Sequence, residues 1–438
     1  MRSTSRISKF GVAAALVHRD FRLFWIGQVT AVTGLQMVMV TQAWLIYDLT
    51  GSALQLGLVG LARAAPAVVL GLVGGVVADK WDQRRLLIVT AVGTSALYLV
   101  LATLTILGAI QVWHILTVVF LTGALHSFEQ PSRQAIFPNL IDRRDMTKAV
   151  ALNSTIHPGT RIVAPLVAGF LIDNVGIPMQ GAAITIYLVS ATYLINSLLV
   201  LRLHLPPVAR AAGGNPIQDL TDGARYILTS HTFRFLIGMT FLNAFFGMSH
   251  IVLLPVFAER LLGDASGSGL AVMYSAAGLG GLMGALATGS LVGRSRAGLV
   301  VIGGGSVFGM TLLAFAFAPW YWLALVLEWL ASASNQLFMV TGQSTLHSQV
   351  PDHYRGRVMG IWGMTHTLVM PMGGLTMGGV ASGFSATVAV AAGGGIVALF
   401  AMFGAGGSSR VRSLGRSDVV GVAGTESPVA ATASPGEE

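Results

Sequence analysis

Glu328 is the residue whose setting most strongly suggests chemistry. It lies in an apolar stretch, 320–344, with no cationic residue close to it in sequence. An ionisable group at mid-bilayer costs at least about 2.5–3.5 kcal/mol on insertion scales, so its presence there suggests a function. Because burial favours the neutral carboxylic acid, Glu328 is a candidate proton carrier. One alternative is that Glu328 forms a structural ion pair with Arg63 or Arg161, the two cations inside other apolar stretches. The second alternative is that Glu328 neither carries protons nor forms such a pair.

Polar side chains also recur on one face of four apolar stretches. Residues at positions i, i+4 and i+7 lie on the same face of a helix. Such faces can line a water-accessible path for a solute, or each polar group can simply make an isolated hydrogen bond between helices. The candidate residues of a substrate cavity are Thr33, Gln36, Thr122, His126, Asn243, His250, Ser332 and Asn335.

The chain lacks the patterns of an ATP-driven pump or of a membrane-embedded enzyme. A phosphate-binding loop ends in Gly-Lys-Ser/Thr, and none of the lysines (Lys9, Lys80 and Lys148) fits it. There is no HExxH motif, no nucleophile elbow and no cysteine, and no two histidines have metal-ligand spacing on one helix. We therefore expect no catalytic residues, cofactor or metal. A membrane-embedded enzyme and a sensor without turnover remain as alternatives.

Twelve apolar stretches would have to position these side chains. Of the 438 residues, 54% are hydrophobic and only 10% are charged, whereas about 25% are charged in soluble domains. A membrane-spanning helix needs about 20 mostly apolar residues. The sequence therefore predicts an all-α polytopic membrane protein with spans at 21–46, 54–78, 86–108, 112–131, 147–172, 181–203, 233–256, 268–292, 297–318, 320–344, 357–381 and 384–404.

The cationic residues predict the orientation of these spans. Lys and Arg resist translocation and collect on the cytoplasmic side. With the N-terminus inside, all of the 26 cationic residues fall on that side except Arg260, on the opposite side, and Arg63 and Arg161, within spans. We therefore expect an inner (cytoplasmic) membrane protein with both termini in the cytoplasm. The net charge of +8 then reflects topology and not nucleic-acid binding.

The order of the spans divides the chain into two six-helix halves. Pro165 and Pro371 interrupt corresponding spans, and other weak matches share nearly the same offset, as in transporters built from repeats. Within the middle loop, 217–228 can form an amphipathic surface helix. The composition of the tail predicts disorder. The expected parts are an N-terminal arm (1–20), a first bundle (21–203), a middle loop (204–232), a second bundle (233–404) and a cytoplasmic tail (405–438).

The loop between the second and third spans carries the most informative motif, G-G-V-V-A-D-K-W-D-Q-R-R at Gly74–Arg85. It resembles the signature of the major facilitator superfamily, Gly-x-x-x-Asp-(Arg/Lys) followed by a basic pair, although Asp82 stands where glycine is common. In that superfamily the loop is a latch that closes the cytoplasmic side; an ordinary basic loop is the alternative. Asp79 can face the positive N-terminal end of a helix, and we expect Glu129 to pair with Arg84 or Arg85. The resemblance implies a cytoplasmic gate of Gly75, Asp79, Lys80, Arg84, Arg85, Glu129, Arg133, Arg355 and Arg357.

Three more segments, Leu49–Ser52, Phe128–Leu140 and Gln349–Gly360, resemble the branch that contains enterobactin-type siderophore exporters and macrolide-type efflux proteins. The resemblance covers about 19–404 and implies two bundles that alternate access to a central cavity lined by spans 1, 4, 7 and 10. These are the spans with the polar faces. One departure is Ala164-Pro165, where exporters often have Gly-Pro.

These observations predict a secondary active transporter and not an enzyme. We expect a proton-coupled exporter, an antiporter, of small lipophilic or amphiphilic molecules such as drugs, siderophores or secondary metabolites. Its partners would be this small-molecule substrate, membrane lipid and protons, and it would act as a monomer without nucleic acid. A solute importer of the same fold is the alternative within the class.

Overall fold

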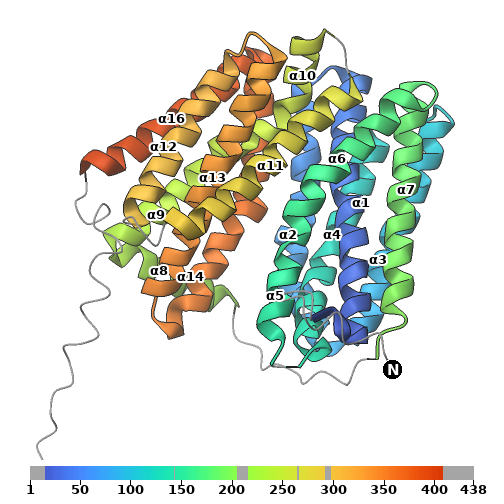
Figure 1. The fold of residues 1–438 in the computed structure, drawn as a ribbon, viewed down its shortest axis with the longest axis horizontal. Coiled ribbons are helices and arrows are strands. Elements are labelled where there is room, and N and C mark those ends of the chain that lie inside the picture. Colours follow the sequence, from blue (N-terminus) through green and yellow to red (C-terminus); the bar gives the residue numbers. More distant parts are fainter. Residues whose placement is uncertain (1–14, 143, 205–215, 264–265, 292–296, 408–438) are drawn as a thin grey trace, which may run out of the picture.

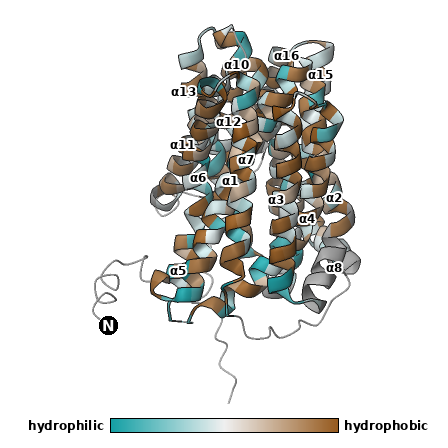
Figure 2. Ribbon diagram, turned by 90° about the vertical axis from the view of Figure 1, so that its right-hand side faces the viewer, coloured by the Kyte–Doolittle hydropathy of each residue, from teal (hydrophilic) through white to brown (hydrophobic). Residues whose placement is uncertain are grey.

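The structure, a computed structural model, describes residues 15–142, 144–204, 216–263, 266–291 and 297–407. Within these ranges it gives the backbone alone for 69, 71–80, 216–220, 231, 290, 352–353 and 404–407. The described chain is built from helices (Figure 1). Figure 2 shows that hydrophobic residues predominate along the lengths of these helices, as expected for a protein in contact with lipid.

The first half packs its long helices into one bundle. Helix α3 packs against α4 and α7, α1 packs against α6 and α7, and α2 packs against α4. A short 3₁₀ turn, η3 (Phe137–Leu140), follows α4. The helices are α1 (Arg19–Thr50), α2 (Ala53–Lys80), α3 (Gln83–Ile106), α4 (Val112–Ile136), α5 (Met146–Ser154), α6 (Ile156–Asn174) and α7 (Pro178–Val200).

The second half forms a matching bundle in which α11 and α12 both pack against α13, and α12 packs against α16. Two of its long helices are interrupted by irregular turns: η4 (Asn243–Gly247) and η5 (Met248–Leu253) in one, and η6 (Thr365–Val369) in the other. The helices are α8 (Pro216–Thr229), α9 (His231–Leu242), α10 (Leu254–Leu262), α11 (Gly267–Leu291), α12 (Ala297–Ala316), α13 (Tyr321–Gln349), α14 (Asp352–Met364), α15 (Met370–Gly383) and α16 (Ala386–Gly407).

The two ends of the molecule differ in how the halves meet. We call the end with Arg19 and Leu140 the basal end, and the end with Gly51 and Gly263 the distal end. In Figure 1 the halves converge at the distal end and diverge toward the basal end. Helix α2 packs against α15, and α6 packs against α11, to join the halves.

The membrane architecture is confirmed, whereas the count of twelve spans stays a prediction. Among the described residues, ten helices are long and apolar enough to cross a bilayer, and Ala53–Val68 of α2 is a shorter apolar helix. The predicted span 357–381 falls on α14, η6 and α15, so its helix is interrupted. The helix predicted at 217–228 exists as α8. Of the tail predicted to be disordered, 405–438, residues 405–407 are instead the end of the helix at 386–407, and 408–438 lie outside the described residues.

Glycines allow helices of the second half to touch backbone to backbone. A Cβ atom added at Gly280 of α11 would lie 2.1 Å from the carbonyl oxygen of Trp329 on α13. A Cβ added at Gly284 would lie 2.2 Å from the carbonyl oxygen of Ala333. Close approach of this kind lets dispersion forces hold helices together in lipid, where burial of apolar surface gives no net drive.

This packing distinguishes two adjacent glycines. We expect Gly280→Ala to lower the thermal unfolding midpoint in detergent, because overpacking costs about 1–3 kcal/mol. Gly281→Ala is the matched control, since a Cβ there meets no atom within 4 Å. It should leave the midpoint unchanged or raise it slightly. Equal midpoints for the two variants would contradict the close α11–α13 contact.

Candidate transport site and gates

A buried histidine–glutamate pair forms the centre of the polar site in the second half. Glu328, on α13, is 0% exposed, and His250, on η5, is 2% exposed. The Nε2 atom of His250 lies 3.0 and 3.3 Å from the two carboxyl oxygens of Glu328. Its Nδ1 atom lies 2.6 Å from the carbonyl oxygen of Gly247. Both ring nitrogens therefore have oxygen partners.

These contacts fix how many protons the pair holds. A carbonyl oxygen only accepts, so Nδ1 of His250 must be the N–H that donates to Gly247. In a neutral imidazole the Nε2 atom is then an acceptor, and its hydrogen bond to Glu328 needs one further proton between them. The pair holds this proton either as imidazolium and carboxylate or as imidazole and carboxylic acid. Loss of the proton would leave a buried carboxylate facing a nitrogen lone pair, which is unfavourable.

The interrupted helix α9–α10 makes this geometry possible. Pro255 has no N–H to donate to the carbonyl oxygen of Ile251 one turn earlier, so the α-helical pattern cannot continue through it. The backbone N–H of Leu254 donates to that oxygen instead, and the hydroxyl of Tyr274 also donates to it over 3.5 Å. Irregular turns inside helices are frequent at functional sites. Here η4 and η5 place His250 beside α13, and the Gly247 carbonyl oxygen holds its ring.

Other predicted cavity residues lie beside the pair. The Ser332 hydroxyl lies 3.4 Å from a carboxyl oxygen of Glu328. Asn243 donates to the side-chain oxygen of Asn335 over 2.9 Å, and Asn335 lies 3.0 Å from the sulfur of Met248. The structure thus brings together five residues that the sequence placed on two separate spans. Neither Arg63 nor Arg161, the predicted ion-pair partners of Glu328, is its neighbour at ion-pair distance, since His250 takes that place.

In the first half the acidic residue Glu129 has a different partner from the one predicted. It pairs with Arg133 one turn along α4, and its carboxylate lies 3.4 Å from Nδ1 of His126. The expected pairing with Arg84 or Arg85 is therefore wrong in this structure. Arg84 instead donates to the carbonyl oxygens of Val200 and Leu201 at the end of α7.

The remaining predicted gate residues are only partly described. Arg357 of α14 pairs with Asp222 of α8 over 3.3 Å, which connects two elements of the second half. Arg355 donates to the Val350 carbonyl oxygen over 3.3 Å. The side chains of Gly75, Asp79 and Lys80 lie outside the described residues. Their role as a latch stays a prediction.

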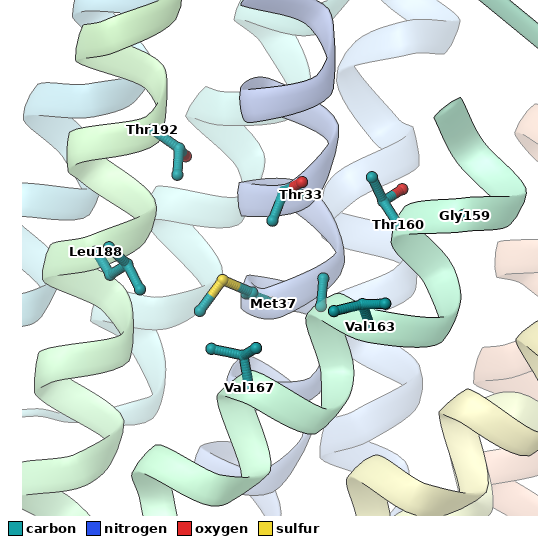
Figure 3. A pocket seen from close by; sticks show the side chains of 9 residues that line it. Thr33, Met37, Gly159, Thr160, Val163, Val167, Leu188 and Thr192 are labelled. Carbon is teal, nitrogen blue, oxygen red and sulfur yellow. The ribbon is translucent and has the colours of Figure 1, made fainter. Parts of the chain in front are cut away.

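Of the predicted cavity residues of the first half, Thr33 alone lines the groove that the structure describes there. Thr33 lies in a groove of about 410 Å³ between α1, α6 and α7 (Figure 3). The hydroxyls of Thr33, Thr160 and Thr192 each donate to a carbonyl oxygen of their own helix, so the groove presents mainly apolar surface. Gln36 is half-buried on α1 and Thr122 is buried on α4. The groove is lined by Thr33, Met37, Gly159, Thr160, Val163, Ala164, Val167, Leu188 and Thr192.

Polar contacts that the sequence analysis missed join the two halves at the distal end. The carboxylate of Asp173, at the end of α6, accepts hydrogen bonds from the backbone N–H groups of Gly267 and Ser268, both at 2.8 Å. It also accepts from the Ser266 hydroxyl at 2.9 Å. A carboxylate from one half thus caps the positive N-terminus of α11 in the other half. We call Asp173 with residues 266–268 the distal cap.

Two further contacts accompany the distal cap. The hydroxyl of Tyr47, on α1, donates to the carboxylate of Glu259, on α10, over 2.5 Å. A Cβ added at Gly57 of α2 would lie 2.7 Å from the carbonyl oxygen of Gly374 on α15. The Ser-Gly-Ser sequence at the start of α11 is a recognisable helix start, but the carboxylate that caps it comes from 93 residues away. No local rule predicts such a partner.

The comparisons with known proteins agree with this architecture. The sequence profile of a family described as transmembrane secretion effector matches residues 10–433. The chain belongs to this family of the major facilitator superfamily. The resemblance noted in the sequence is thereby confirmed, and the protein is a membrane transporter of small molecules.

Curated relatives of this family member include siderophore transporters. It is 28% identical to the staphyloferrin A transporter of Staphylococcus aureus, over 82% of this chain and 86% of that protein. It is 26% identical to the enterobactin exporter EntS of Salmonella typhi, over 83% and 86% of the two chains.

Solved structures share the fold. A bacterial homologue of the lysosomal transporter Spinster, in an inward-facing and occupied conformation, superposes with a TM-score of 0.72 at 14% identity, over 90% of this chain and 98% of that one. The nucleoside transporter NupG gives a TM-score of 0.71 at 15% identity, over 89% and 98%.

The distal cap predicts how the halves are held together. The chain has no cysteine, so spin labels at Leu107→Cys and Phe384→Cys, on exposed distal turns of the two halves, report their separation. We expect Asp173→Ala to add a population with a longer label–label distance, because it leaves the N-terminus of α11 uncapped.

Asn174→Ala is the matched control for this measurement. Asn174 is exposed and bonds only to the Phe170 carbonyl oxygen of its own helix among the described contacts. Its distance distribution should match that of the unmodified pair. A distribution for Asp173→Ala that is equally unchanged would show that the cap does not hold the distal end closed.

Proposed function

We propose that this transporter is a proton-coupled exporter of small molecules of the siderophore class. The His250–Glu328 pair is the observation that supports this most directly. A titratable pair fully buried in a membrane protein is expensive to maintain and suits a proton-binding step. The names of the two curated relatives, a staphyloferrin A transporter and an enterobactin exporter, support siderophores as cargo.

The orientation follows from the charges. Outside the spans, the described Lys and Arg residues lie on the basal side except Arg260, which supports a basal end that faces the cytoplasm of an inner-membrane protein. The described state, with the halves in contact at the distal end, is then inward-open. Cargo enters from the cytoplasm between the diverging halves, and rocking of the halves opens the distal side. In that second state the latch around Asp79, Arg84 and Arg85 closes the basal end.

The proton count of the pair defines its part in this cycle. In the outward-open state the pair takes up a proton from the acidic outer side. In the inward-open state, of which the described geometry is the protonated form, it releases that proton to the cytoplasm, and cargo moves the other way. Both bundles belong to one chain, so a monomer is sufficient for alternating access.

The function is tested by transport into everted membrane vesicles, whose lumen corresponds to the outside of the cell. With an acidic lumen, the protein should accumulate enterobactin or staphyloferrin A. We expect Glu328→Gln to lower this accumulation at least about tenfold. A glutamine amide can still donate to Nε2 of His250, so folding and cargo binding should be retained while proton exchange is lost.

Asp142→Asn is the control, because it removes an exposed carboxylate outside the site. It should transport at the unmodified rate. Full proton-driven accumulation by Glu328→Gln would remove the pair from the mechanism. Uptake that occurs only in right-side-out vesicles would instead show that the protein is an importer.

A further inference from the structure

Arg161 is a cation inside a membrane span, and the proton site described above gives it no role. It lies on α6 of the first half, is half-buried, and within the described residues has no carboxylate at ion-pair distance. A cation inside a membrane span is costly unless it serves a function. Its guanidinium interacts electrostatically with the Glu328 carboxylate of the second half.

Glycines of α11 bring the helices that carry these two charges, α6 and α13, close together on either side of α11. A Cβ added at Gly278 would lie 2.8 Å from the carbonyl oxygen and 3.2 Å from the side-chain Cγ of Arg161. One half-turn on, Gly280 packs against the backbone of Trp329, the residue after Glu328. Helix α11 is therefore thin at the level where it separates α6 from α13. A larger residue at either glycine would push the two charged helices apart.

The contact between α6 and α11 also belongs to the part of the molecule that must move. Ser275 of α11 donates to the Ile162 carbonyl oxygen of α6 over 2.8 Å, next to Arg161. The distal cap joins the same two helices at Asp173. Opening of the distal end separates α6 from α11 and so carries Arg161 away from Glu328.

We propose that Arg161 is a positioning charge that gives the His250–Glu328 pair a lower proton affinity in the inward-open state than in the outward-open state. This inference rests on the proposed function. With Arg161 close, as in the described state, its positive charge opposes protonation of the pair and favours release of the proton to the cytoplasm. When the distal end opens, the charge withdraws and the pair takes up a proton from outside.

The other charged and titratable groups around this site are few among the described residues. Arg63 of α2 and Tyr274 of α11 interact electrostatically with one another, and Tyr274 also interacts with Arg161 and Glu328. His157 lies one turn before Arg161 and interacts with it. The α12 neighbours of His250 are the rings of Phe308 and Phe315, which carry no charge. Arg161 is the first-half cation whose electrostatic interaction with Glu328 changes when the halves move.

Linkage makes the proposal measurable without cargo. If proton affinity differs between the states, protons must shift the balance between them by the same factor. An opposite charge near a carboxyl group changes its proton affinity by about tenfold or more. We therefore expect acidification to raise the ratio of outward-open molecules, which are closed at the basal end, to inward-open molecules, which are open there, about tenfold. Spin labels at Val150→Cys of α5 and Leu228→Cys of α8, both exposed near the basal end, report this ratio in the purified full chain.

The decisive comparison is between variants of Arg161. We expect Arg161→Gln to reduce the pH-driven change in this ratio to less than about twofold, whereas Arg161→Lys, which keeps the charge, retains most of it. Arg202→Gln, which removes an exposed cation at the end of α7, should keep the full change. In transport assays the pH profile of Arg161→Gln should move to higher pH by about one unit, because removal of a positive charge makes proton binding easier.

A double variant separates this role from a merely structural one. In a Glu328→Gln background, Arg161→Gln should have no further effect on the pH response, since the pair no longer exchanges a proton. A full tenfold response in Arg161→Gln, together with its loss in Glu328→Gln, would overturn the role of Arg161 and leave the proton site intact. No pH response in the unmodified protein, with proton-driven export still present, would likewise overturn only this inference. Loss of proton-driven export itself would overturn the proposed function.

Discussion

The hydrogen bond between His250 and Glu328 is the constraint on which the rest of the site depends. In the bilayer interior neither side chain can be left without a partner, because an unpaired buried polar group costs several kcal/mol. The pair satisfies both groups with one proton and a carbonyl oxygen from Gly247. The irregular turns η4 and η5 place the His250 ring against that carbonyl oxygen. The break in the helix and the titratable pair are thus one structural feature.

The contact between the halves is asymmetric for a related reason. At the distal end, backbone N–H groups at the start of α11 need acceptors, and Asp173 of the other half supplies them. Glycines at Gly57, Gly169 and Gly378 let helices of the two halves approach closely there. These contacts depend on short distances, so a small rotation of one half breaks several at once. Such an interface favours two discrete states over a continuous range.

Arg161 and Glu129 illustrate two different treatments of charge within the same membrane region. Glu129 has Arg133 and His126 on its own helix, so its neighbours move with it. Arg161 has its electrostatic partner in the opposite half. A charge paired within one half stabilises that half, whereas a charge that acts between halves changes its energy when the halves move. Only the second kind can connect protonation to conformation.

The sequence by itself determined the membrane helices. With 54% hydrophobic and only 10% charged residues, the chain has too little charge to form a water-facing surface. It also singled out Glu328, His250, Asn243, Ser332 and Asn335, since a polar group in an apolar span stands out by its cost. Tertiary structure decided the partners. Glu328 meets His250 and not an arginine, Glu129 meets Arg133 and not Arg84, and Thr33 faces a lateral groove. The distal cap joins residues 93 positions apart, and such a contact depends on how two bundles are placed in space, which no local pattern of residues encodes.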